Sequence, residues 1–118
     1  MNPSGEDFDY QARLAERGAW LEYDMIGMDY FYADQQAQSP SDEENARALL
    51  RLRDAGLLGS VLISQDVFIK IQLVRYGGTG YAHILDNFVP RLRRHGFTEQ
   101  DIEMLLVHNP RRVFAGGD

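Results

Sequence analysis

Two stretches of the chain are apolar at nearly every position, although the residues around them are largely polar. Residues 19–23 read AWLEY, and residues 61–63 read VLI. Short continuous apolar runs of this kind are typical of strands that are covered on both faces, as in a parallel sheet. The sequence therefore predicts two buried parallel strands. The first runs into Asp24, and the second leads to Asp66.

Four other segments have the apolar spacing of helices that bury one face. Ser41 and Glu44 form a capping box, in which each side chain binds a backbone N–H of the other residue, so a helix should begin there. Pro90 is expected to kink or interrupt the helix in which it lies. The predicted helices span residues 8–17, 42–55, 84–95 and 98–108, and Asn109 with Pro110 is expected to end the last of them.

The order of these elements is typical of βαβ units, in which a helix connects two parallel strands. Residues 25–40, between the first strand and the second helix, are expected to form a long loop. The predicted fold class is therefore α/β. Two parallel strands do not make a stable sheet by themselves, because their edges need partners and their faces need helices. The sequence predicts an α/β segment whose sheet is incomplete.

Length and composition narrow the class of protein. The chain has 118 residues, of which 44% are hydrophobic, and this suits one domain or one piece of a larger domain. It has 18 acidic against 12 basic side chains, which argues against nucleic acid and against anionic membranes as partners. Cysteine is absent, which excludes disulfides and thiolate ligands. The first residues, MNPSGEDFD, lack the basic and apolar pattern of a signal peptide, and no apolar run reaches the roughly 20 residues of a membrane span. We expect a cytoplasmic protein.

Asp66 and Asp24 are the first candidates for chemistry. In α/β proteins the carboxyl ends of parallel strands and the loops after them hold ligands and metals. The alternative, that either aspartate only caps a turn or a helix, stays open at this point. His83, His95 and His108 are widely spaced on predicted helices, so we expect them at the surface or near helix ends. The glycine-rich stretch 77–80 lacks the lysine of a phosphate loop and is expected to be a flexible connection.

Five motifs, taken together and in order, resemble the C-terminal part of the phosphotriesterase family. They are RGAWLEYDMIG, SPSDEENARALLRLRDAG, VLISQDVF, RYGGTGYAHIL and VPRLRRHGFTEQDIEMLLVHNPRRVF. The members of that family are metal-dependent hydrolases of the amidohydrolase superfamily. The resemblance implies a (β/α)8 barrel with a two-metal centre, usually zinc, at the carboxyl ends of its strands. This chain would supply the last two strands of the barrel with their helices, and it would be incomplete when isolated.

The resemblance also implies roles for individual residues. Asp66 matches the aspartate that ends the last strand of the family barrel, where it would bind one metal and accept the proton of the metal-bridging hydroxide during attack on a small-molecule ester, which could be a phosphotriester, a carboxyl ester or a lactone. The loops after the two strands would shape the substrate pocket. The residues in these loops are Asp24, Met25 and Gly27 after the first strand, and Arg75, Tyr76 and Gly77 after the second.

Several features depart from the family pattern. The chain has no His-x-His pair, and its single lysine, Lys70, follows Asp66, where the family has no bridging residue. The opening MNPSG resembles the sequence directly after one of the family's ligand histidines, so the chain is expected to begin just beyond that residue. Gln65 stands where many members have histidine. Met25 stands where lactonase-like members tend to have arginine, which weakens a lactonase assignment.

These departures predict that the chain alone neither binds zinc tightly nor catalyses the family reaction, because one carboxylate cannot hold a dinuclear centre. Activity would need a complementing N-terminal chain that supplies the other strands. The alternative is a non-catalytic half-barrel remnant, which buries its exposed surfaces by forming a homo-oligomer or by binding a protein partner.

Overall fold

Two parallel strands lie at the centre of the computed structural model, which describes residues 7–116. Strand β1 (Leu21–Tyr23) pairs with β4 (Val61–Ile63), with Leu21 opposite Val61 and Tyr23 opposite Ile63. Leu21 and Val61 are fully buried. The two predicted strands and their parallel pairing are confirmed. Within the described residues each of these strands has one paired edge, so the other edge of each is open.

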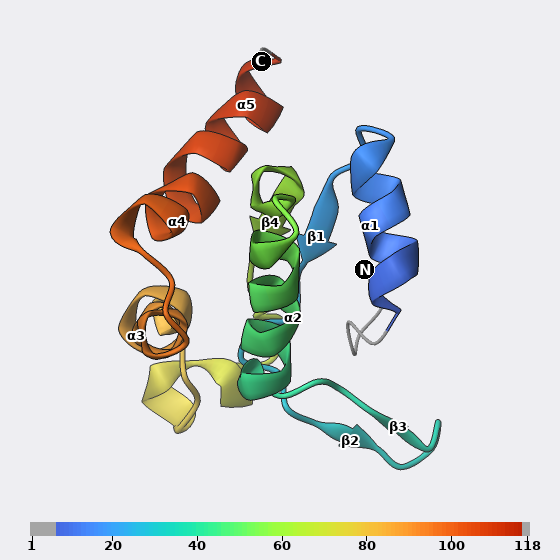
Figure 1. Ribbon diagram of the computed structural model, residues 1–118. Coiled ribbons are helices and arrows are strands. Elements are labelled where there is room, and N and C mark those ends of the chain that lie inside the picture. The colour runs from blue at the N-terminus through green and yellow to red at the C-terminus, as the bar shows by residue number, and fades with distance from the viewer. Residues whose placement is uncertain (1–6, 117–118) are drawn as a thin grey trace.

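Helices α1 (Phe8–Glu16) and α2 (Asp42–Asp54) cover the strands. In Figure 1, α2 stands in front of the strands, between α1 and the helices that follow β4. The capping box predicted from Ser41 and Glu44 is confirmed, because each side chain binds the backbone N–H of the other residue. Leu49 and Leu52 on the inner face of α2 are fully buried in the core.

The chain around and after β4 is mostly helical and contains short 3-10 turns and two π-helical turns. A 3-10 turn (Leu58–Ser60) leads into β4, and two more, Lys70–Gln72 and Val74–Tyr76, follow it. A π-helical turn (Ile84–Phe88) then leads into α3 (Val89–Arg94), and a second one (Met104–His108) joins α4 (Glu99–Glu103) to α5 (Asn109–Ala115).

Both prolines in this region are the second residue after a π-helical turn. The N–H of Val89 donates to the carbonyl of Ile84, and the N–H of Asn109 donates to that of Met104, five residues back in each case. A proline in a regular helix collides with the carbonyl four residues before it, and a widened turn moves that carbonyl away. Pro90 therefore coincides with a change of helical type. The expectation that Asn109 and Pro110 end the last helix is wrong, because helical structure continues to Ala115.

The segment expected to be a long loop contains a short hairpin. Strands β2 (Phe31–Tyr32) and β3 (Ala37–Gln38) are antiparallel, with Tyr32 opposite Ala37. Figure 1 shows this hairpin projecting away from the body beside the N-terminal end of α2. Gln36 in its turn has a φ of 50°, in the left-handed region. The prediction of a loop without strands is thus wrong for these residues.

Candidate functional site

The two strands end at the same edge of the sheet, and the loops that follow them lie side by side. The N–H of Ser64 donates to the carbonyl of Tyr23 over 2.9 Å, and the N–H of Ile26 donates to the carbonyl of Ser64 over 3.2 Å. This ladder continues the pairing of β1 and β4 past both strands. Asp24 and Asp66 therefore lie just beyond neighbouring strand ends, and both are exposed.

One buried side chain holds the backbone that follows Asp66. Gln72, only 6% exposed, donates from Nε2 to the carbonyl oxygen of Asp66 over 2.9 Å. Its Oε1 accepts the N–H groups of Phe68 and Ile69 at 2.8 and 2.9 Å. Side-chain amides that satisfy several backbone groups fix a loop as a turn of secondary structure would. The strand-end carboxylate thus stands on an ordered backbone.

The other end of the same loop is held by Gln65, the residue before Asp66. Its Nε2 donates to the carbonyl of Gly80 over 2.7 Å, and its Oε1 accepts the N–H of Ile84 over 3.2 Å. A Cβ on Gly78 would lie 2.2 Å from the carbonyl carbon of Gln72, so only glycine fits there. The expectation that stretch 77–80 is merely a flexible connection is wrong for Gly78, which packs against backbone.

The remaining predicted pocket residues fall into two groups. Met25 and Gly27 are half-buried beside the end of β4, and the N–H of Gly27 donates to Asp42. Arg75 and Tyr76 are exposed in the loop after β4, where the Arg75 guanidinium lies 5.8 Å from the centre of the Tyr76 ring. Gly77 follows them with a φ of 93°. A hollow of about 200 Å³ in this loop is lined by Val67, Phe68, Ile69, Lys70, Leu73 and Tyr81.

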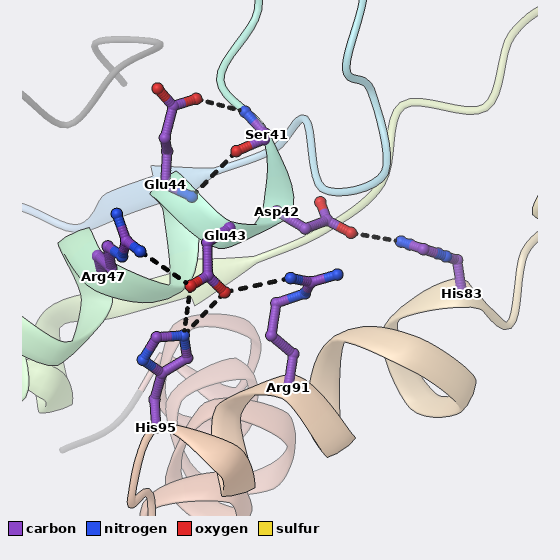
Figure 2. Close-up of polar contacts among 8 residues, drawn as sticks. All are labelled: Ser41, Asp42, Glu43, Glu44, Arg47, His83, Arg91 and His95. Carbon is purple, nitrogen blue, oxygen red and sulfur yellow. Dashed lines mark hydrogen bonds and ion pairs between the residues drawn. The ribbon is translucent and has the colours of Figure 1, made fainter.

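A second polar group, absent from the sequence predictions, surrounds the first turn of α2 (Figure 2). The Nε2 atom of His83 lies 2.6 Å from Oδ2 of Asp42, and these side chains are only 9% and 12% exposed. The Nε2 atom of His95 lies 2.9 Å from Oε1 of Glu43. The expectation of a position at the surface or near a helix end is confirmed for His95, which caps the end of α3, and for exposed His108. A surface position is wrong for His83, which is buried.

Glu43 pairs with three basic side chains. Besides His95, its carboxylate accepts from Arg91 over 3.1 Å and pairs with Arg47 at 3.4 Å. Hydrogen bonding from His95, and to a smaller degree from Arg91, lowers the pKa of Glu43 below its usual value. The carboxylate stays ionised because its partners favour the charged form. This cluster joins α2 to α3.

The donor set for a metal is incomplete in this part of the protein. Among residues 7–116, no three histidine, cysteine, aspartate or glutamate side chains gather closely enough to hold a metal ion. A dinuclear centre requires several such ligands, so Asp66 alone is not enough to hold one. Nor is any described helix long and apolar enough to cross a membrane.

The model of the phosphotriesterase family matches residues 3–114. The chain belongs to the phosphotriesterase family. Among curated relatives, the N-acetyltaurine hydrolase of Dictyostelium discoideum is 34% identical over 111 residues, which are 92% of this chain and 30% of that protein. The chain thus spans about a third of the length of this relative, and the family resemblance in the sequence is confirmed.

Similar folds are found among solved structures. A resiniferatoxin-binding protein from Rhodobacter sphaeroides is 60% identical with a TM-score of 0.94, and the match covers 100% of this chain and 33% of that one. The phosphotriesterase homology protein of Escherichia coli, complexed with phosphate in its active site, is 32% identical with a TM-score of 0.77, over 91% of this chain and 34% of that one. The predicted fold class, an α/β segment of a (β/α)8 barrel, is confirmed.

Proposed function

We propose that this chain carries one metal ligand and part of the pocket wall of a zinc-dependent hydrolase that acts on ester bonds. One observation carries the proposal. Asp66 stands exposed at the carboxyl end of a parallel strand, beside the end of β1, on a backbone braced by Gln72. That end of the strands is where barrel enzymes place their active sites. Membership of a hydrolase family supports the same assignment.

The proposed roles follow the two loops. Asp66 is the zinc ligand and catalytic carboxylate. Asp24, Met25 and Gly27 form one wall of the pocket, and Arg75, Tyr76 and Gly77 form another. The other ligands of a two-zinc centre would come from strands outside these residues, because the described part of the chain lacks them. We therefore expect this chain alone to bind zinc weakly and to be inactive. Activity would require the missing strands, supplied by a complementing N-terminal chain or by the rest of a longer protein.

The substrate class is proposed as small molecules with a phosphotriester, carboxyl ester or lactone bond. The name of the Dictyostelium relative adds a carboxamide to the classes worth testing. The loop after β4 supports substrates with an apolar part, since most residues that line its hollow are apolar.

A chimera tests this function. In it, the 118 residues replace the matching third of the Rhodobacter sphaeroides protein, to which they are 60% identical. We expect zinc-dependent hydrolysis of at least one ester in a panel, and a loss of about 100-fold or more with Asp66→Ala. The matched control is Asp86→Ala, which removes an exposed carboxylate from the helical segment after β4 and should leave the rate unchanged. Equal rates for Asp66→Ala and the intact chimera would refute the role given to Asp66.

A second candidate function is a non-catalytic half-barrel remnant that self-associates or binds a protein partner. Exposed apolar side chains favour it. Phe68, Ile71 and Val74 are 64%, 63% and 72% exposed, and the outer edges of β1 and β4 are open within the described residues. Surfaces of this kind promote association. Sedimentation of the isolated chain discriminates between the candidates, because a stable zinc-free oligomer favours this second function, and a monomer argues against it.

A further inference from the structure

Asp42 binds two segments that lie far apart in the sequence. Its Oδ1 accepts the N–H of Gly27 over 2.8 Å, and its Oδ2 lies 2.6 Å from Nε2 of His83. Gly27 belongs to the loop after β1, whereas His83 follows the glycine-rich loop after β4. Figure 2 shows the Asp42 side chain directed toward His83 and away from the Glu43 cluster. One carboxylate therefore joins the loop after β1 to the start of the helical segment that follows the other pocket loop.

The His83 ring also rests directly on Gly27. A Cβ at position 27 would lie 2.8 Å from Cδ2 of His83, and the φ of Gly27 is 88°. Contact this close requires glycine, and a positive φ favours glycine as well. Ile84, the residue after His83, donates its N–H to Gln65, which precedes Asp66. A continuous set of contacts thus runs from Gly27 through Asp42 and His83 to the residue before Asp66.

The position of Asp42 in α2 explains why a carboxylate serves here. It is the first residue of the helix, where the partial positive charge of the helix stabilises an anion. The capping box of Ser41 and Glu44 fixes that turn and so fixes the direction of the Asp42 side chain. With Asp42 and His83 both largely buried, hydrogen bonds to the carboxylate are charge-assisted and strong. The hollow beside the pair, about 240 Å³, is also lined by the charged groups Asp29, Glu43 and Arg91.

We propose that Asp42 and His83 are positioning residues of the pocket. They hold loop 24–27 at a fixed place against the end of β4, and they do so without touching substrate. The inference rests on the proposed function for its consequence in catalysis, but the coupling of the two loops is a property of this chain alone. Displacing a pocket wall by even about 1 Å is enough to lower the efficiency of an enzyme.

Glu43 provides a matched control. It is a carboxylate in the same helical turn, and it also pairs with a histidine, His95. Its partners lie on α2, α3 and the residue after α3, and none of them belongs to the two loops. Asp42→Ala and Glu43→Ala therefore remove similar charges, but only Asp42→Ala frees the N–H of Gly27. His83→Gln tests rescue, because its amide retains an N–H donor for Asp42, whereas His83→Leu does not.

The first measurement is amide hydrogen exchange at Gly27 in the isolated chain. We expect Asp42→Ala to accelerate exchange at Gly27 by about ten-fold or more, relative to amides in β4. Glu43→Ala should leave exchange at Gly27 unchanged, and His83→Gln should protect Gly27 better than His83→Leu. Unchanged exchange in Asp42→Ala, or equal acceleration in Glu43→Ala, overturns the proposal. Should Asp42→Ala fail to fold, Asp42→Asn, which keeps an acceptor for Gly27 but loses the charge, takes its place with a smaller acceleration expected.

The second measurement is the kinetics of the chimera described above. We expect Asp42→Ala to raise KM by about ten-fold, with a smaller change in kcat, and Glu43→Ala to change neither. Unchanged kinetics in Asp42→Ala, despite faster exchange at Gly27, would reduce the pair to a structural role and overturn the assignment. A chimera that is inactive with every substrate refutes the proposed function instead, and exchange at Gly27 then still decides whether Asp42 couples the loops.

Discussion

Gln72 donates a hydrogen bond to the carbonyl oxygen of Asp66 over 2.9 Å, from six residues farther along the chain. The same buried side chain accepts the N–H groups of Phe68 and Ile69. The backbone on which Asp66 stands is therefore ordered by this chain itself, before any other strand of a barrel is present. This local bracing links the fold of the chain to the role proposed for Asp66.

Gln72→Leu should destabilise the chain by about 1–3 kcal/mol, because it leaves three backbone groups of the loop without their partner. The measurement is urea unfolding. Gln100→Leu, at an exposed position of α4, is the control and should change stability by less than about 0.5 kcal/mol. Equal effects of the two substitutions would show that the bonds made by Gln72 do not stabilise the fold.

Asn109 joins the start of α5 to the start of β4. It is fully buried, and its Nδ2 donates to the carbonyls of Leu58 and Val61 over 2.9 and 2.7 Å. Asn109→Leu should cost about 2–4 kcal/mol in thermal or urea unfolding, because it removes two buried hydrogen bonds from a side chain to backbone carbonyls. Asn87→Leu, at an exposed site, should cost far less. A small loss at position 109 would mean that α5 packs on β4 without this link.

Acid should weaken the contact between α2 and α3. The pKa of Glu43 in the folded chain lies below its usual value of 4.5, chiefly through the hydrogen bond from His95. The unfolded chain therefore takes up this proton at higher pH than the folded chain does. The contribution of Glu43 is complete above about pH 4.5 and is lost as the pH falls through the folded pKa.

Melting temperatures between pH 7 and pH 3 measure this effect. Glu43→Gln should lower the melting temperature at pH 7 and flatten its fall with acid. Glu16→Gln, at the exposed end of α1, should leave the profile as it is in the unsubstituted chain. An identical acid profile for Glu43→Gln would contradict the assignment.

Alkali should lower the stability of the folded chain through Tyr23. Burial raises the pKa of its phenol from 10.0 to about 12, and the hydrogen bond with Gln11 only partly offsets this. The unfolded chain loses the proton first, so stability should be constant below pH 10 and should fall as the pH rises from 10 toward 12. Tyr23→Phe should remove part of that fall. At pH 7 it should cost about 1 kcal/mol, because Gln11 loses its donor.

Urea unfolding at pH 8 and pH 11 tests the effect of Tyr23. Tyr10→Phe is the control, since Tyr10 is 46% exposed. A loss of stability between these two pH values that is the same in Tyr23→Phe and in the unsubstituted chain would contradict the prediction.

Signals within a few residues predicted the elements around the site well. The apolar runs that became β1 and β4 and the capping box at Ser41 all depend on neighbours in the sequence. For that reason the sequence alone predicts the strand ends that carry Asp24 and Asp66. Their position at one edge followed from the parallel pairing expected for a βαβ unit.

Contacts between distant residues could not be predicted in this way. Asp42 and His83 are separated by 41 positions, and nothing local distinguishes a helix-capping aspartate from one that binds a buried histidine. The two-residue strands of the hairpin are too short to show an alternating pattern. The rule that proline breaks a helix assumes bonds four residues apart, whereas the turns before Pro90 and Pro110 use bonds five residues apart.

The number of zinc ions bound by the purified chimera tests the central claim most directly. We predict that the isolated chain retains none after dialysis, that the chimera with Asp66 retains two per molecule, and that Asp66→Ala lowers this number. Two tightly bound zinc ions in the isolated chain, or two in the Asp66→Ala chimera, would contradict the claim that Asp66 is one ligand of a centre completed from outside these 118 residues.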